Sequence, residues 1–288
     1  MPGIVIQLIV SGIAMGFIYA LVGIEYTLIW NASGVLNFSH DKMTTLGAYM
    51  FGGTFIAIFG VSTIPGIILS IIVMGMIGLI ISRVIFIPLR HMTMIFTIMA
   101  TIMLGKIILE GIRLIWGPVP FKVSGFLIGT IKIGGIVISK ANIAIIISAA
   151  IIVLLLQLFL YKTKIGKAMR CVAQNKKASL LMGIDVEMVM SIAVMISIMI
   201  CCLIGILVSP LLNISTTMSS MIGLKGFAAG VIGGFGYLPG AIIGGLCIGI
   251  IENLASMIFA SVYKDVIAFV LLIMFLLIRP KGITGKTR

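Results

Sequence analysis

Most residues of this chain that could bind a ligand or perform chemistry lie inside long apolar stretches. The densest polar group is the run Asn37-Phe-Ser-His-Asp-Lys42, which two apolar segments flank without a proper loop. An interrupted helix whose free backbone groups face a cavity is a common way to build a binding site within a membrane. We therefore predict that Asn37, Ser39 and His40 line a substrate pathway, and an ordinary short cytoplasmic turn is the alternative.

A second polar position interrupts an apolar segment near the C-terminus. Glu252 and Asn253 stand in a stretch made otherwise of Gly, Ile, Leu and Ala. A charge inside a membrane segment is costly and is a functional candidate by default. A place along the substrate route and a helix-to-helix hydrogen bond are equally good interpretations of this pair.

Motifs for enzyme chemistry are missing from the sequence. There is no His-Glu-x-x-His, and His40 and His91 are too far apart to form a local metal motif. No Gly-x-Ser-x-Gly elbow is present. The segment 280–287 resembles a phosphate loop, but it lacks the first glycine and no helix can follow it. We therefore predict a chain that is not an enzyme and that holds no catalytic residues, metal, cofactor or nucleotide of its own.

The composition indicates the elements that must position these polar groups. Of the 288 residues, 61% are hydrophobic and only 9% are charged, whereas soluble domains carry about 25% charged residues. Since each crossing needs roughly 20 apolar residues, we predict an all-α polytopic membrane protein with about 8–9 transmembrane or re-entrant helices. The apolar segments lie near 4–30, 43–60, 64–82, 93–116, 142–161, 189–210, 240–260 and 264–278.

The amino-acid composition of the region 117–142 differs from that of these segments. The region contains two prolines and then β-branched residues separated by glycines. This pattern predicts a small β-hairpin outside the bilayer.

The basic residues predict the orientation of the chain. The net charge is +13, and the bases gather in 162–177 and in the tail 279–288. Short basic loops mark the cytoplasmic side of a membrane protein, so we expect lipid rather than nucleic acid beside them. A cytoplasmic loop 162–188 and a cytoplasmic C-terminus place the N-terminus outside. They also require the Gly-rich stretch 221–236 to complete an even number of crossings, as a short or broken helix buried in protein.

The loop 162–188 also contains a docking candidate. Asn175 is the predicted N-cap and Gly183 the predicted C′ residue of a short helix. Ala178, Leu181 and Met182 share its apolar face, which suits a groove on another protein. A surface helix attracted to anionic lipid is the alternative. On the docking interpretation, charge changes at 176 and 177 matter less than the apolar face.

Four ordered stretches resemble one known family, the permease subunits of branched-chain amino acid ABC importers of the LivH type. The resemblance runs nearly end to end. It rests on Gly34-Val-Leu-Asn-Phe-Ser-His40 with Leu46-Gly-Ala-Tyr49, Gly166-Lys-Ala-Met-Arg-Cys-Val-Ala173 with Ala178-Ser-Leu-Leu-Met-Gly-Ile184, Gly223-Leu-Lys-Gly-Phe-Ala-Ala229 with Pro239-Gly-Ala-Ile-Ile-Gly-Gly245, and Tyr263-Lys-Asp265 with Arg279-Pro-Lys-Gly282.

The resemblance implies a single permease domain over 1–288 in the cytoplasmic membrane of a prokaryote. It implies pairing with a second permease subunit, either a related chain or a copy of itself. Two cytoplasmic ATP-binding subunits and an extracytoplasmic substrate-binding protein complete the importer, and the partner subunits use the ATP. Transport would proceed by alternating access, driven through the loop helix around 178–183.

Four positions depart from the family pattern. The family usually has glycine where Glu25, Asn31 and Asp41 stand, and an acidic residue where Lys42 stands. These changes flank the polar break, so they bear on which substrate the chain takes within the family. Urea and short amides, which closely similar permeases import, stay alternative substrates. A stand-alone secondary transporter or channel is an alternative of another class. The docking loop and the lack of an acidic cluster count against that class.

Overall fold

The structure is a computed structural model that describes residues 2–123, 125–127, 129–133, 136–257, 263–279 and 282–283. The chain forms two compact units. The first unit comprises Met1–Thr27, Ser124–Ile151 and Ser220–Arg288. The second unit comprises Leu28–Val123 and Ile152–Ser219. Two long helices, α1 (Pro2–Ser33) and α5 (Lys140–Lys162), contribute residues to both units.

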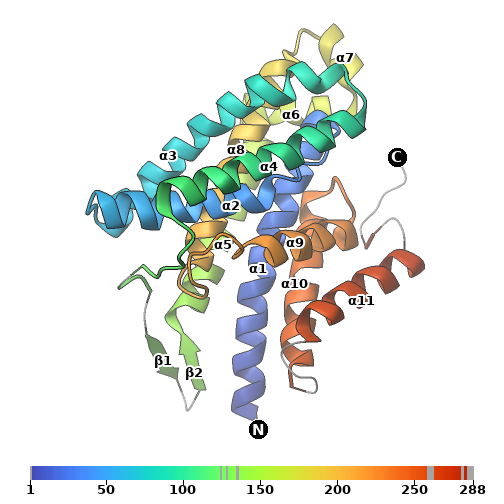
Figure 1. Cartoon of the computed structure of the whole chain (residues 1–288). Helices are drawn as coiled ribbons and strands as arrows, with labels where there is room; N and C mark the ends of the chain where they lie inside the picture. Colours follow the sequence, from blue (N-terminus) through green and yellow to red (C-terminus); the bar gives the residue numbers. More distant parts are fainter. Residues whose placement is uncertain are drawn as a thin grey trace. The chain divides into compact units, whose positions relative to one another are not determined.

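The first unit is built on close packing between glycine-containing helices. Its helices besides α1 and α5 are α9 (Ser220–Gly233), α10 (Leu238–Ala255) and α11 (Lys264–Ile278), and α9, α10 and α11 lie side by side (Figure 1). A Cβ at Gly16 would lie 2.9 Å from the Leu246 Cα atom, and one at Gly12 would lie 3.0 Å from the Gly249 carbonyl oxygen. Gly12 and Gly16 of α1 therefore pack closely against α10 of the same chain, as small residues in membrane helices commonly do.

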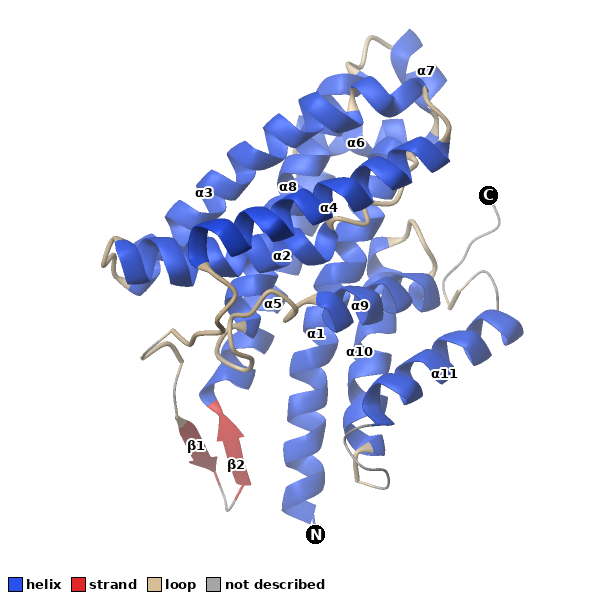
Figure 2. Ribbon diagram, viewed as in Figure 1, coloured by secondary structure: helices blue, strands red, loops and turns tan. Residues whose placement is uncertain are grey.

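A two-stranded sheet forms in the predicted hairpin region, as Figure 2 shows. Strands β1 (Thr130–Ile133) and β2 (Ile136–Ser139) pair antiparallel, with Thr130 opposite Ser139. The two residues between the strands lie outside the described residues. The β-branched, glycine-broken pattern therefore predicted a hairpin correctly.

The second unit is centred on α8 (Val186–Val208), which packs against α2 (His40–Tyr49) and α3 (Thr63–Ile81). Its other elements are the π-helix η1 (Met50–Ile58), the π-turn η2 (Ser82–Phe86), the 3₁₀ turn η3 (Pro88–His91), α4 (Met94–Trp116), α6 (Lys164–Gln174) and α7 (Lys176–Leu181). A Cβ at Gly47 of α2 would lie 2.5 Å from the Cys202 Cα atom of α8. This close approach fixes the residues that follow the polar break against α8.

Six of the described helices are long and apolar enough to cross a membrane, namely Gly3–Ser33, Thr63–Phe86, Met94–Trp116, Lys140–Lys162, Val186–Val208 and Leu238–Ala255. On α3, large apolar side chains at a four-residue spacing are all more than half exposed: Ile64, Ile68, Ile72, Met76 and Ile80. Residues four apart lie on the same face of a helix, so these side chains form one exposed apolar stripe. Such a stripe suits a lipid environment.

One predicted crossing is less regular than expected, because the segment 43–60 is divided between α2 and η1. Helix α11 has the predicted bounds and is 15 residues long. The Gly-rich stretch forms the short helix α9, which has 14 residues. At 1.5 Å per residue α9 is roughly 21 Å long, shorter than the hydrocarbon core of roughly 30 Å.

Candidate functional site

The predicted polar break at residues 37–42 begins between two helices and continues into the second of them. Helix α1 ends at Ser33 and α2 begins at His40. Asn37 is 1% exposed, and Ser39 and His40 are fully buried. The Asn37 Oδ1 atom accepts hydrogen bonds from the Ser39 backbone N–H (3.1 Å) and from the Ser39 hydroxyl (2.6 Å). Asn37, Ser39 and His40 are therefore buried in the second unit, whereas Phe38 between them is 42% exposed.

Other helices of the second unit supply contacts to this break. The Phe38 N–H donates to the Thr101 hydroxyl of α4 at 3.2 Å. The Cys201 Sγ atom of α8 lies 3.2 Å from the His40 Nδ1 atom. The Asn37 Nδ2 atom is buried and has no hydrogen-bond partner among the described residues. A buried amide donor without a partner is unfavourable by about 1–3 kcal/mol, so a polar ligand group placed there would be stabilised.

The four positions that depart from the family pattern have different surroundings. Asp41 and Lys42 form an ion pair with a distance of 2.7 Å between Oδ2 and Nζ. This pair neutralises two of the unusual charges beside the break. Glu25 is fully buried, and Asn31 is partly buried.

Glu252 is the centre of a buried polar network in the first unit. The Tyr19 hydroxyl of α1 donates to its Oε2 atom at 3.0 Å. The Lys225 ammonium of α9 donates to its Oε1 atom at 2.8 Å and lies 2.6 Å from the Asp265 Oδ1 atom of α11. The neighbouring Asn253 side chain donates to the Gly249 carbonyl of its own helix at 3.0 Å. Glu252 thus makes helix-to-helix contacts, which is one of the two roles that the sequence allowed for it. The other role is a place along the substrate route.

Sequence reasoning missed the partners of Glu252, although one signal was available. Lys225 is the only charged residue in the Gly-rich stretch 221–236, and an isolated charge in such a segment indicates a buried partner. Tyr19 and Asp265 gave no comparable signal because a tyrosine hydroxyl and a helix-start aspartate are common in any membrane protein.

The predicted docking helix is α7, and its two caps are as expected. The Asn175 Oδ1 atom accepts from the Ala178 N–H at 3.1 Å. Gly183 has φ +78°, the Gly183 N–H donates to the Leu180 carbonyl, and the Ile184 N–H donates to the Ser179 carbonyl. This is the Schellman arrangement, in which a residue in left-handed conformation ends the helix.

The apolar face of α7 points into open surroundings. Leu181 is 90% exposed and Met182 is 77% exposed, and Ala178 is also exposed. A Cβ at Gly183 would meet no other atom within 4 Å. Two large apolar side chains on a capped turn are poorly placed in water, so this face suits a partner or a lipid surface.

The two lysines that begin α7 differ from each other. The Lys176 ammonium donates to the Ser33 carbonyl at 2.6 Å, and partial burial lowers the pKa of Lys176. Lys177 is exposed. The expectation that both charges matter little therefore needs correction at Lys176, because that side chain ties α7 to the end of α1.

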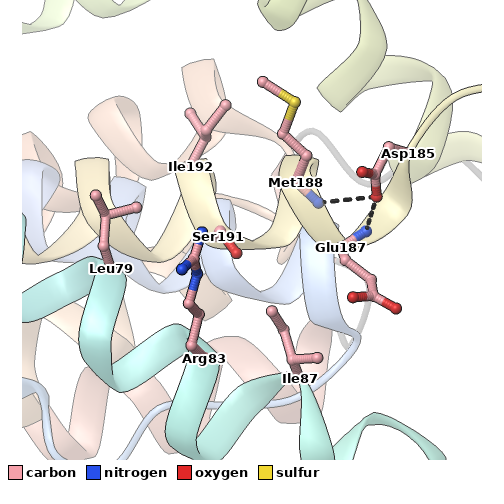
Figure 3. A pocket seen from close by; sticks show the side chains of 8 residues that line it. All are labelled: Leu79, Arg83, Ile87, Asp185, Glu187, Met188, Ser191 and Ile192. Carbon is pink, nitrogen blue, oxygen red and sulfur yellow. Dashed lines mark hydrogen bonds between the residues drawn. The ribbon is translucent and has the colours of Figure 1, made fainter.

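A cavity of about 460 Å³ lies between α3–η2 and the start of α8 (Figure 3). Its wall combines apolar, basic and acidic side chains: Leu79, Arg83, Ile87, Asp185, Glu187, Met188, Ser191 and Ile192. The Asp185 carboxylate caps α8 by accepting from the Glu187 and Met188 N–H groups. Glu187 also pairs with Arg90. The acidic groups are thus used to hold the start of α8.

Long apolar helices, a helix interruption with buried polar side chains and an exposed apolar turn together define a polytopic helical membrane protein. The chain belongs to the family described as the branched-chain amino acid transport system / permease component, whose model matches residues 8–276. It is a multi-pass protein of the cell membrane and a non-catalytic transport subunit. The resemblance seen in the sequence is therefore confirmed.

Relatives in bacteria and archaea match over most of their length. The chain is 31% identical to the high-affinity branched-chain amino acid transport system permease protein BraD of Pseudomonas aeruginosa, over 98% of this chain and 96% of that protein. It is 29% identical to the permease protein LivH of Escherichia coli over the same shares. It is 28% identical to the probable permease protein LivH of Methanocaldococcus jannaschii, over 92% and 88%.

One solved structure is similar in fold. PsaBC from Streptococcus pneumoniae in complex with Fab superposes with a TM-score of 0.51 and 14% identity, over 96% of this chain and 91% of that chain. At this identity the likeness shows the fold alone.

Proposed function

We propose that this chain is the membrane-spanning permease subunit of an ATP-driven ABC importer that translocates branched-chain amino acids by alternating access. The observation that carries the proposal is the family match over 8–276, together with relatives named as branched-chain amino acid permeases over nearly their whole length. The family match favours this function over urea or short amides and over a stand-alone secondary transporter or channel.

The importer would be completed by a second permease subunit, two cytoplasmic ATP-binding subunits and an extracytoplasmic substrate-binding protein. The partner subunits would bind and hydrolyse the ATP, and α7 would receive the resulting movement. The exposure of Leu181 and Met182 supports this role, since an apolar face of this kind fits a groove on another protein. Closure of the ATP-binding subunits would then displace Ala178–Gly183 and switch the side to which the pathway opens.

The topology we propose has the N-terminus outside and the loop 162–188 and the C-terminus inside. The two units would form a single permease domain over 1–288 with about 8–9 transmembrane or re-entrant helices. The predicted cytoplasmic tail lies largely outside the described residues. Helix α9 would be the incomplete crossing, since Ile222, Gly226 and Ala229 are among its many buried residues and a short helix is tolerated where protein surrounds it.

The substrate pathway would include the break at Asn37, Ser39 and His40. The buried, unpaired Asn37 Nδ2 atom supports this assignment because it offers a donor that the described residues do not use. Glu252 and Asn253 are the second candidate region.

Uptake of labelled Leu, Ile, Val and urea, in cells with and without the gene, tests the proposed function. We expect gene-dependent uptake of the three branched-chain amino acids and no gene-dependent uptake of urea. Uptake that persists when the ATP-binding subunits are deleted would instead support a stand-alone transporter.

A further inference from the structure

Lys225 is a buried cation that joins three helices of the first unit. It is 4% exposed, and its Nζ atom lies 2.8 Å from Glu252 Oε1 on α10 and 2.6 Å from Asp265 Oδ1 on α11. The Lys225 Nζ atom also lies 5.9 Å from the centre of the Tyr19 ring. The Tyr19 hydroxyl donates a hydrogen bond of 3.0 Å to the other carboxylate oxygen of Glu252, Oε2. The three helices lie next to one another in Figure 1.

Stability does not explain why a charge stands at this position. Removing an ammonium and a carboxylate from water is costly, and replacing a buried ion pair by apolar residues of similar size is often neutral or stabilising. A methionine at 225 beside an uncharged residue at 252 would be at least as suitable for an apolar helix. The charges therefore indicate a need for a particular geometry.

The shape of α9 indicates which geometry the charges hold. The helix is too short to be held in place by the bilayer thickness. Small residues form part of its contact with α10, because a Cβ at Gly233 would collide with the Gly240 backbone and one at Gly244 with the Ala229 backbone. Small residues allow close approach but interlock little, so they resist sliding weakly. The ion pair between Lys225 and Glu252 sets the register of α9 along α10.

The two carboxylates around Lys225 are not equivalent. The Glu252 side chain is 7% exposed, whereas the Asp265 side chain is 42% exposed. If Asp265 moves away, water hydrates it and Glu252 still neutralises Lys225. If Glu252 moves away, a carboxylate is left buried without its cation, which is strongly unfavourable. The contact to Asp265 is the separable one.

We propose that Lys225 is a positioning residue of the transport cycle. It holds α9 in register with α10 through Glu252, and it releases and recaptures Asp265 at the start of α11 as the subunit changes conformation. This inference rests on the proposed transport function.

The test compares variants of the complete importer in proteoliposomes. Lys225→Met alone leaves Glu252 buried without its cation and is expected to reduce the amount of folded subunit. The double variant Lys225→Met with Glu252→Gln removes both charges, and we expect it to accumulate like the wild type because the buried charge is gone. Its uptake per ATP hydrolysed should nevertheless fall about tenfold, within the usual range of a coupling free energy. Lys225→Arg keeps the positive charge and should couple uptake to ATP hydrolysis like the wild type. Lys132→Met, at an exposed position, is the matched control.

The Asp265 step has its own measurement. Spin labels at Leu224 on α9 and Val266 on α11, which are 48% and 54% exposed, report the separation of the two helices. In the wild type we expect the distance to change when nucleotide is added. In Asp265→Asn we expect the nucleotide-bound distance to be populated without nucleotide.

Three outcomes separate the claims. Wild-type coupling in the double variant would reduce the network to a structural role and overturn the inference. A distance between the labels that never changes would overturn the release of Asp265. Absence of branched-chain amino acid uptake by the wild type would contradict the proposed substrate, while the nucleotide-dependent distance would still decide the role of Asp265.

Discussion

The Lys176 ammonium donates a hydrogen bond of 2.6 Å to the backbone carbonyl of Ser33. Lys176 is the first residue of α7, and Ser33 is the last residue of α1. The residue after Ser33 begins the interruption between α1 and α2, in which Asn37 and Ser39 are buried. A single side chain therefore connects the proposed docking helix to the backbone that leads into the proposed substrate pathway.

We expect Lys176→Met to weaken this connection. Net hydrogen bonds in proteins contribute about 0.5–1.5 kcal/mol, so the variant should fold while uptake per ATP hydrolysed decreases. Lys177→Met is the matched control because Lys177 is the exposed neighbour on the same turn. Equal effects of the two changes, measured as uptake and ATP hydrolysis in proteoliposomes, would show that only charge near the membrane matters.

The polar break gives a second prediction. Asn37→Ala removes the acceptor of two hydrogen bonds and also the unpaired Nδ2 donor, and His40→Ala removes a buried ring. Both should reduce uptake of branched-chain amino acids while the protein still reaches the membrane.

Ser39→Ala separates the turn from the amide, because it removes one hydrogen bond to the Asn37 Oδ1 atom and keeps the Asn37 amide. Membrane abundance by immunoblot separates a folding defect, worth about 1–3 kcal/mol for an unpaired buried donor, from loss of transport. Normal uptake by Asn37→Ala and by His40→Ala would move the pathway to Glu252 and Asn253.

Local patterns in the sequence predicted the local elements of this fold well. The β-branched run before Lys140 became a hairpin, and Asn175 and Gly183 cap α7 as their chemistry requires. These features depend on neighbours within a few residues. The amphipathic helix α6 was missed because its three basic residues were interpreted only as part of a cytoplasmic charge cluster.

Contacts between distant segments could not be predicted in the same way. Tyr19 and Glu252 are 233 residues apart, and Phe38 and Thr101 are 63 apart. Helical periodicity shows which face of a helix is polar but not which helix it meets. The Gly-rich texture of 221–236 predicted a short buried helix, but not the ion pairs that hold it.

Orientation is the third prediction, and it follows from the distribution of bases. In a chain whose exposed Cys171 and Cys247 are replaced by serine, Lys167→Cys should react only after permeabilisation of the cells. Lys132→Cys in the hairpin should react from outside with a membrane-impermeant maleimide. Labelling of Lys167→Cys in intact cells would reverse the proposed topology.

The packing of α1 on α10 gives a fourth prediction. A Cβ at Gly245 would lie 2.5 Å from the Ala20 nitrogen and 2.7 Å from the Gly16 carbonyl oxygen, all of them backbone atoms. Gly245→Ala should therefore destabilise the protein by about 1–3 kcal/mol, as overpacking does. Gly111→Ala on α4 is the control, since its Cβ would meet nothing within 4 Å. Thermal unfolding in detergent should show a lower midpoint for the first variant only.

The last prediction concerns docking of α7. Ala178→Glu places a carboxylate on the exposed apolar face and should block close approach of an ATP-binding subunit without disturbing the fold. Gly183→Ala forces a β-carbon into a left-handed conformation with φ +78°, at a cost of about 1 kcal/mol or more. Both variants should hydrolyse ATP with less uptake and should retain less ATP-binding subunit during purification.

A surface helix held by anionic lipid predicts a different ranking of variants. In that case Lys177→Glu would be the most damaging change, because it reverses an exposed charge near the membrane, where each basic residue contributes about 1 kcal/mol. If α7 docks into a protein groove, Lys177→Glu should do less than Ala178→Glu, since an exposed ion pair is worth only about 0–1 kcal/mol. Co-purification of the ATP-binding subunits with each variant decides between the two. Full retention by Ala178→Glu would exclude docking through this face.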